Sequence, residues 1–239
     1  MLLKIRRLVL GSTLALGLIA SSVATFAQGT FRNLNFESAT VPNVPPNLPV
    51  LLNASDAVPG WTVYIGTNQS SQVWYNGISA GGAFVSIIDR HTAYVGNRVI
   101  SFNFTATLDS GIAFFGGTGI PVSAALAETG LIPGFAHSLL FGASGDVSAM
   151  RVTFNGQDLP FVMIGTGPNY QMYGADISSI AGQTGELRFT ELPITPPTFP
   201  IAFLDAIQFS QFSVPEPTTP ALLAVGGLML ALWMFRRRQ

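Results

Sequence analysis

The stretch Arg151-Val152-Thr153-Phe154-Asn155-Gly156 decides the expected fold. Its first four residues alternate between polar and apolar side chains, as a β-strand with one buried face requires. Asn155-Gly156 is a strong signal for a two-residue hairpin turn, because both residue types tolerate positive φ. We expect the returning strand at residues 161–164. This segment therefore predicts antiparallel β-structure.

Similar strand signals recur along most of the chain. Short runs rich in Val, Ile, Phe, Tyr and Thr alternate with Gly, Pro, Asn and Asp, and no helix of useful length is indicated between the two chain ends. Many short strands separated by turn residues predict an all-β sandwich or barrel. The predicted strands are residues 61–65, 72–75, 83–88, 99–107, 112–115, 122–127, 137–141, 150–154, 161–164, 186–190 and 203–209.

An apolar run near the C-terminus, residues 220–235, is followed by Arg236, Arg237 and Arg238. The run holds 16 uncharged residues, so as a helix it spans roughly 24 Å, against about 30 Å for a hydrocarbon core. The arginine stems can extend this span at the interface. Positive charge beside a span is retained on the cytoplasmic side, so the arginines act as a stop and the rest of the protein lies outside. We expect a single transmembrane helix at residues 220–235.

A short motif, Val214-Pro215-Glu216-Pro217, precedes this run. Its prolines fix their own φ and favour extended conformations before them, so Glu216 is presented on a stiff segment that a processing enzyme can grip. The order of motif, apolar run and arginine cluster in residues 214–239 resembles the PEP-CTERM sorting signal of Gram-negative bacteria. The resemblance implies export, membrane anchoring through the C-terminus, and processing by a membrane-embedded exosortase.

The N-terminus has the order of a secretory signal peptide. Lys4, Arg6 and Arg7 precede an apolar segment at residues 8–20, and small and polar residues follow as far as Ala27. We expect residues 1–27 to be removed, with an uncleaved N-terminal anchor as the alternative. Residues 28–213 then form one β-sandwich domain, which is long enough to bury a core of its own.

The charge balance of the exported part restricts its partners. Five arginines, no lysine and all 12 acidic residues fall between Gln28 and Pro217, so the formal charge of this segment is −7. Phosphate neutralisation requires clustered cations, so nucleic acid is not an expected partner. The chain has no cysteine, which excludes disulfides and thiolate chemistry.

Four stretches of the domain occur in a familiar order: Asn33-Leu34-Asn35-Phe36-Glu37, Val58-Pro59-Gly60-Trp61-Thr62-Val63, residues 181–189, and Phe203-Leu204-Asp205-Ala206-Ile207. This order resembles the galactose-binding-like jelly rolls of secreted bacterial proteins. The resemblance implies a jelly-roll β-sandwich and does not specify a ligand, because function depends on the site rather than on the fold.

Jelly rolls of this kind often hold a structural calcium ion. The resemblance points to Glu37 and Asp205 as its ligands, together with loop carbonyls, since calcium prefers oxygen ligands. A second acidic residue that is typical after the position of Asp205 is replaced here by Ala206.

Sugar binding is one possible activity of the domain. Aromatic side chains can stack on sugar rings, and the candidates are Tyr64, Trp74 and Tyr75. The alternative for each is packing at the edge of the apolar core with its polar atom outward.

Catalytic motifs are absent from the sequence. His91 and His137 are the two histidines, and no Gly-x-Ser-x-Gly, His-Glu-x-x-His or phosphate-binding glycine loop occurs. We therefore predict no enzymatic activity, although two carboxylates at a suitable separation would suffice for a glycosidase. The expected function is that of an exported protein of the cell surface or the extracellular polysaccharide matrix, with a structural or adhesive role. A dedicated carbohydrate-binding module is the first alternative, and a secreted hydrolase is the second.

Overall fold

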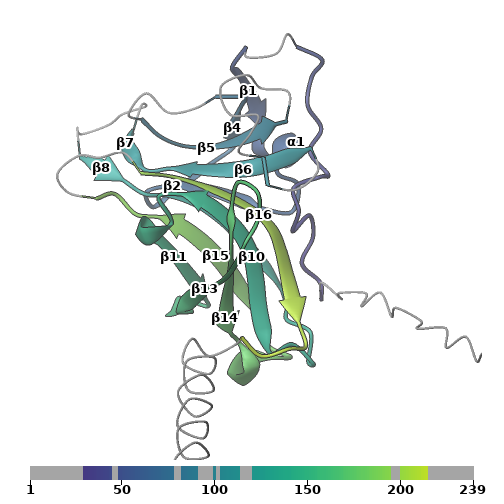
Figure 1. Cartoon of the computed structure of the whole chain (residues 1–239). Helices are drawn as coiled ribbons and strands as arrows, with labels where there is room; N and C mark the ends of the chain where they lie inside the picture. The colour runs from purple at the N-terminus through teal and green to yellow at the C-terminus, as the bar shows by residue number, and fades with distance from the viewer. Residues whose placement is uncertain are drawn as a thin grey trace, which may run out of the picture.

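The computed structural model describes residues 29–44, 48–77, 82–90, 99–100, 103–113, 120–194 and 200–214. These residues form two β-sheets with very little helix (Figure 1). The all-β prediction is therefore confirmed. Among these residues no helix is long and apolar enough to cross a membrane. The predicted signal peptide, the Pro215-Glu216-Pro217 motif, the span at residues 220–235 and the terminal arginines lie outside the described residues.

The larger sheet contains ten of the described strands, and most neighbours in it are antiparallel. Strand β16 lies near its centre, between β6 and β10. In spatial order the main strands are β1 (Val50–Asn53), β4 (Gln72–Tyr75), β5 (Gly82–Asp89), β6 (Phe104–Asp109), β16 (Ile201–Ser210), β10 (Ser138–Gly145), β14 (Gln171–Asp176) and β13 (Phe161–Thr166), with β7 (Gly111–Ala113) beside β5 and β8 (Pro121–Val122) beside β7.

In the described part of the chain the smaller sheet contains six strands, and it packs against the larger sheet (Figure 1). Its spatial order is β12 (Gln157–Asp158), β11 (Met150–Phe154), β15 (Thr184–Glu191), β9 (Ala124–Leu131), β2 (Thr62–Ile65) and β3 (Asn68–Ser70). One helical turn, α1 (Ala54–Ala57), connects β1 to the β2–β3 hairpin, and two single 3₁₀ turns occur at Val147–Ala149 and Ser178–Ile180.

The core lies between the inner faces of the two sheets. Strand β15 shows the required alternation: Leu187 and Phe189 are buried, whereas Glu186 and Arg188 are partly exposed. Phe141 of the larger sheet meets Phe189 of the smaller sheet with ring centroids 5.3 Å apart. The burial of such aromatic pairs supplies much of the stabilisation of a two-sheet fold.

The Asn155-Gly156 turn forms and a strand does occur at residues 161–164, within β13, but the prediction that this strand returns beside β11 is wrong. Both residues have positive φ, 50° and 78°, and the chain returns immediately as β12, which pairs Gln157 with Phe154. Pro160 follows, and proline cannot donate a ladder hydrogen bond. The chain then crosses to the larger sheet, where β13 pairs with β14.

Candidate functional site

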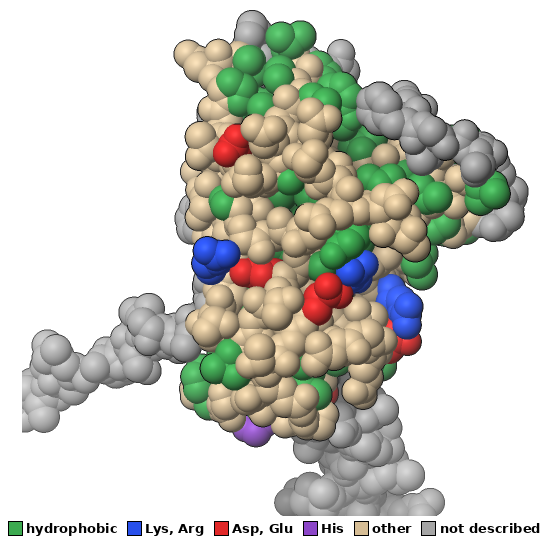
Figure 2. Space-filling view, turned by 180° about the vertical axis from the view of Figure 1, so that it is seen from behind, with side chains coloured by type: hydrophobic (Ala, Val, Ile, Leu, Met, Phe, Trp, Pro, Cys, Tyr) green, Lys and Arg blue, Asp and Glu red, His purple; other side chains and the backbone are tan. Residues whose placement is uncertain are grey.

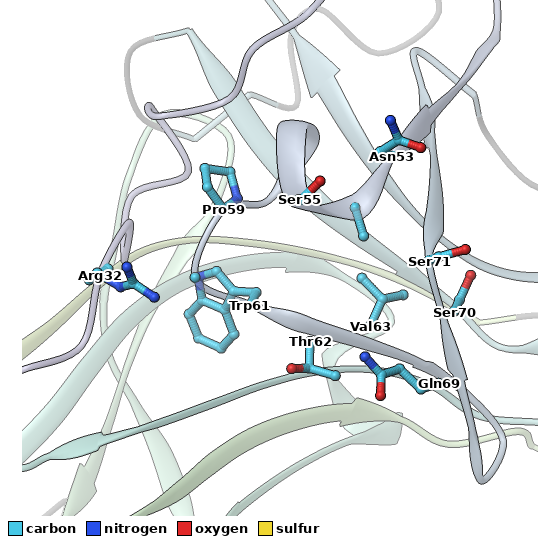
Figure 3. Close-up of a pocket in the computed structure, with 12 residues that line it drawn as sticks. Arg32, Asn53, Ser55, Pro59, Trp61, Thr62, Val63, Gln69, Ser70 and Ser71 are labelled. Atoms are coloured by element: carbon cyan, nitrogen blue, oxygen red, sulfur yellow. The ribbon is translucent and has the colours of Figure 1, made fainter.

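A polar groove lies between the N-terminal segment, helix α1 and the β2–β3 hairpin (Figure 3). Its volume is about 510 Å³. Arg32 lies on one side, and Gln69, Ser70 and Ser71 lie on the other. The remaining lining residues are Asn53, Ala54, Ser55, Pro59, Gly60, Trp61, Thr62 and Val63.

The groove combines hydroxyl and amide side chains with one cation. Hydroxyl and amide groups both donate and accept hydrogen bonds, and the Arg32 guanidinium only donates. Arg32 is exposed, and no ion pair of its guanidinium is present among the described residues. Such a lining suits a neutral or anionic ligand that carries many hydroxyl groups.

Trp61 is part of the floor of this groove and of the core beneath it. Only 5% of the residue is exposed, and its ring packs against Phe36 and Phe189 with centroid distances of 5.6 and 6.2 Å. Its indole N–H donates to the Asn33 carbonyl at 3.2 Å. The ring therefore fixes the position of the groove and offers little surface for stacking.

Backbone constraints hold the N-terminal segment against this floor. Asn33 has φ 53°, and its side-chain amide donates to the Pro59 carbonyl at 3.1 Å. Gly60 has φ 96°, and an added Cβ there would lie 3.3 Å from both Arg32 Cβ and Glu128 Oε1. Glycine therefore allows the two segments to approach each other closely.

Glu128 lies beneath the Arg32 side of the groove. Its Oε1 accepts a hydrogen bond from the Arg32 backbone N–H at 2.8 Å, and its Oε2 is buried without a hydrogen-bond partner among the described residues. Burial raises the pKa of Glu128 from 4.5 to about 7, although the Arg32 N–H and the Arg32 charge oppose this shift. Glu128 was not among the residues predicted from sequence. It has the same parity in β9 as the core residues Ala124 and Leu126, which identifies it as inward-facing.

Glu191 is a second buried carboxyl group, at the end of β15. It is 0% exposed, and neither of its carboxylate oxygens has a hydrogen-bond partner in the described part of the chain. Burial, followed by the negative charges of Asp146 and Asp109, raises the pKa of Glu191 from 4.5 to about 9. Its neutral form is therefore favoured in the fold at neutral pH.

The three aromatic residues predicted for sugar stacking do not form one platform. Tyr64 lies in β2 of the smaller sheet, whereas Trp74 and Tyr75 lie in β4 of the larger sheet. The Arg188 guanidinium covers the Tyr64 ring, 4.1 Å from its centroid. Trp74 packs edge-on against Phe84 at 6.4 Å.

Tyr75 is only 4% exposed, and its hydroxyl donates to the Asp89 carboxylate. Burial and then this hydrogen bond raise the pKa of Tyr75 to about 12. Its ring therefore belongs to the core rather than to an open surface.

The two residues predicted for calcium lie on either side of the start of β6. Glu37 Oε1 accepts from the Asn103 and Phe104 N–H groups at 2.9 and 3.0 Å. Asp205, in β16, accepts from Thr105 Oγ1 at 2.9 Å. Both carboxylates thus face N–H or O–H donors, and no group of three or more His, Asp or Glu side chains suited to a metal occurs in the described residues. Calcium at Glu37 and Asp205 remains a prediction.

His137 does not line the groove. His137 is exposed and precedes β10, where its backbone N–H donates to Ser210 at 2.8 Å. His91 lies outside the described residues.

Comparisons with known proteins identify no family for this chain. No family model matches the chain, and no curated protein matches it. Two solved structures are similar in part. The K1 cleaved adhesin domain of Lys-gingipain from Porphyromonas gingivalis W83 is 11% identical, with a TM-score of 0.39 over 68% of this chain and 98% of that domain. The K2 cleaved adhesin domain of Lys-gingipain is 14% identical, with a TM-score of 0.34 over 74% of this chain and 95% of that domain. At these TM-scores neither likeness bears on the activity of this chain.

Proposed function

We propose that this protein is exported from a Gram-negative cell, is held in the membrane by residues 220–235, and is processed by an exosortase at Pro215-Glu216-Pro217. Its β-sandwich then has a structural or adhesive role at the cell surface or in the extracellular polysaccharide matrix. The two sheets are arranged as a jelly roll, and residues 1–27 are removed as a signal peptide.

One observation supports this proposal: the described part of the domain is held together as far as Val214, the residue before Pro215-Glu216-Pro217. After β16, the Phe212 carbonyl accepts from Ser138 Oγ at 2.7 Å. Val214 packs over Gly174, where an added Cβ would lie 3.1 Å from Val214 Cγ2. The described chain is therefore held against the domain as far as Val214, and Pro215-Glu216-Pro217 comes next in the sequence.

Peptide mapping of the mature protein tests the processing step. Trypsin cleaves after Arg188 and Arg236, so an unprocessed chain yields a peptide of residues 189–236. We expect this peptide to be absent from the exported wild-type protein and present in a Glu216→Ala variant, which disrupts the motif and leaves the domain unchanged. An intact peptide in the exported wild-type protein would refute processing.

The polar groove favours a second function, carbohydrate binding. Arg32, Asn53 and Gln69 offer donors and acceptors from three separate segments around one hollow, which is the arrangement that fixes a polyhydroxylated ligand. In this proposal Trp61 shapes the floor, and the groove rather than Tyr64, Trp74 and Tyr75 holds the sugar.

Binding to a panel of insoluble and soluble polysaccharides tests this function. We expect Gln69→Ala and Arg32→Ala to weaken binding several-fold. Arg151→Ala is the matched control, because Arg151 is exposed in β11, pairs with Asp158 of β12 and does not line the groove. Equal binding by wild type and both groove variants, with all proteins folded, would exclude the groove as the sugar site.

A further inference from the structure

Exposed apolar side chains gather at the end of the sandwich where the chain leaves it. Leu131 is 37% exposed, Phe135 is 48% exposed and Phe212 is 65% exposed. We call these three residues the end patch. Figure 2 shows hydrophobic side chains at the end of the molecule that carries the described histidine, His137. Exposed apolar groups gathered at one place indicate a contact with a partner or a membrane.

Hydrogen bonds hold the end patch in a fixed shape. The His137 N–H donates to the Ser210 carbonyl at 2.8 Å, and Ser138 Oγ donates to the Phe212 carbonyl at 2.7 Å. The Phe212 N–H in turn donates to Ser210 Oγ at 3.0 Å. These bonds join the segment before β10 to the segment after β16. Phe135 and Phe212 are therefore presented by ordered backbone.

The length of the remaining chain places this end close to the predicted span. Only residues 215–219 separate Val214 from the apolar run that begins at Pro220. Fully extended, this connection reaches about 20 Å, and a less extended connection brings the domain nearer. When residues 220–235 span the bilayer, the end from which Val214 emerges must face it.

We propose that the end patch lies in the interfacial region of the bilayer while the chain is anchored, with the lipid surface as its partner. This inference rests on the proposed membrane anchoring. Phenylalanine and leucine are the side chains that enter the boundary between headgroups and acyl chains. The contact orients the domain and sets the height of Pro215-Glu216-Pro217 above the membrane before processing.

Single-cysteine labelling tests this orientation, because the natural chain contains no cysteine. The full chain carries an environment-sensitive fluorophore at Phe135→Cys, Phe212→Cys, Ile120→Cys or Leu228→Cys. It is reconstituted into phosphatidylethanolamine and phosphatidylglycerol vesicles with or without lipids that carry a quenching spin label. Ile120 is the matched control, since it is 64% exposed and lies beside β8, away from the end patch (Figure 1).

We expect labels at positions 135 and 212 to be quenched several-fold more strongly than the label at position 120. Phe212→Gln is expected to reduce the quenching at position 135, because the two residues contact the lipid together. Quenching at position 228 without quenching at positions 135 and 212 would refute the proposed contact between the end patch and the lipid, and would leave the proposed membrane anchor standing. A label at position 228 that remains in water would overturn both proposals.

Discussion

Glu128 Oε1 accepts a hydrogen bond from the backbone N–H of Arg32 at 2.8 Å, across 96 positions of sequence. This bond joins strand β9 to the segment that forms one wall of the groove. It gives the inward-facing carboxyl group a hydrogen-bond donor close to Gly60. The remaining oxygen, Oε2, has no partner among the described residues, so ionisation of Glu128 is opposed and stability depends on pH.

The Glu128→Gln variant is expected to remove part of this pH dependence. The pKa of Glu128 is raised from 4.5 to about 7, so its contribution to stability is fully present below about pH 4.5 and is lost as the pH rises to about 7. Glutamine keeps an acceptor for the Arg32 N–H and does not titrate. Denaturant unfolding from pH 4 to pH 8 should show that the free energy of unfolding depends less on pH in the variant than in the wild type. Identical pH dependence would contradict the raised pKa of Glu128.

The Glu191→Gln variant is expected to stabilise the protein at pH 8. The pKa of Glu191 is raised to about 9, so stability is lost from about pH 4.5 up to about pH 9, because the carboxyl group ionises in the unfolded chain while it stays neutral in the fold. Removing the titrating carboxyl group should raise the free energy of unfolding by roughly 1–3 kcal/mol. The gain is limited because the buried glutamine amide still lacks hydrogen-bond partners. Glu186→Gln on the exposed face of β15 is the control, and a Glu191→Gln variant less stable than wild type at pH 8 would refute the prediction.

Gly145→Ala is expected to cost more than about 2 kcal/mol of unfolding free energy. Gly145 has φ 84°, and an added Cβ would lie 2.2 Å from the Ile201 carbonyl oxygen. Gly134→Ala is the matched control, since nothing lies within 4 Å of its added Cβ. Thermal unfolding of both variants tests whether the end of β10 requires glycine, and equal melting temperatures would contradict this requirement.

Adjacent residues of β15 should differ sharply in their effect on stability. Phe189→Ala removes a ring that packs on Phe141 and Trp61 and should cost about 3–5 kcal/mol. Arg188→Ala removes a partly exposed ion pair with Glu186 and should cost less than about 1 kcal/mol. Similar losses in urea unfolding would show that the two sheets do not pack through Phe189.

The strands that sequence predicts well are those with a strong local pattern. Met150–Phe154 and Gln72–Tyr75 occur at the predicted bounds, because alternation and turn residues are local signals. Strand β14 (Gln171–Asp176) was not predicted, because glycine does not favour strands and Gly174 interrupts the local pattern. Gly174 fits this position because Val214 packs closely over it. The passage of the chain from β12 in the smaller sheet to β13 in the larger sheet was also not predicted, because tertiary packing decides which sheet a strand joins.

The groove could not be predicted because its residues come from distant segments. Arg32, Asn53 and Gln69 share no motif, and only the fold brings them around one hollow. The aromatic candidates Tyr64 and Tyr75 were selected by residue type. Their surroundings, the Arg188 guanidinium and the Asp89 carboxylate, depend on pairing between strands that sequence does not specify.

We propose that the exported protein loses its C-terminal span at the Pro215-Glu216-Pro217 motif. The intact mass of the protein purified from the outer surface or the medium tests it most directly. We predict a mass that corresponds to a chain that begins near Gln28 and ends within or next to this motif. A mass of 25.3 kDa for the full chain, or a mass that corresponds to a chain that still ends at Gln239, would contradict the proposed processing.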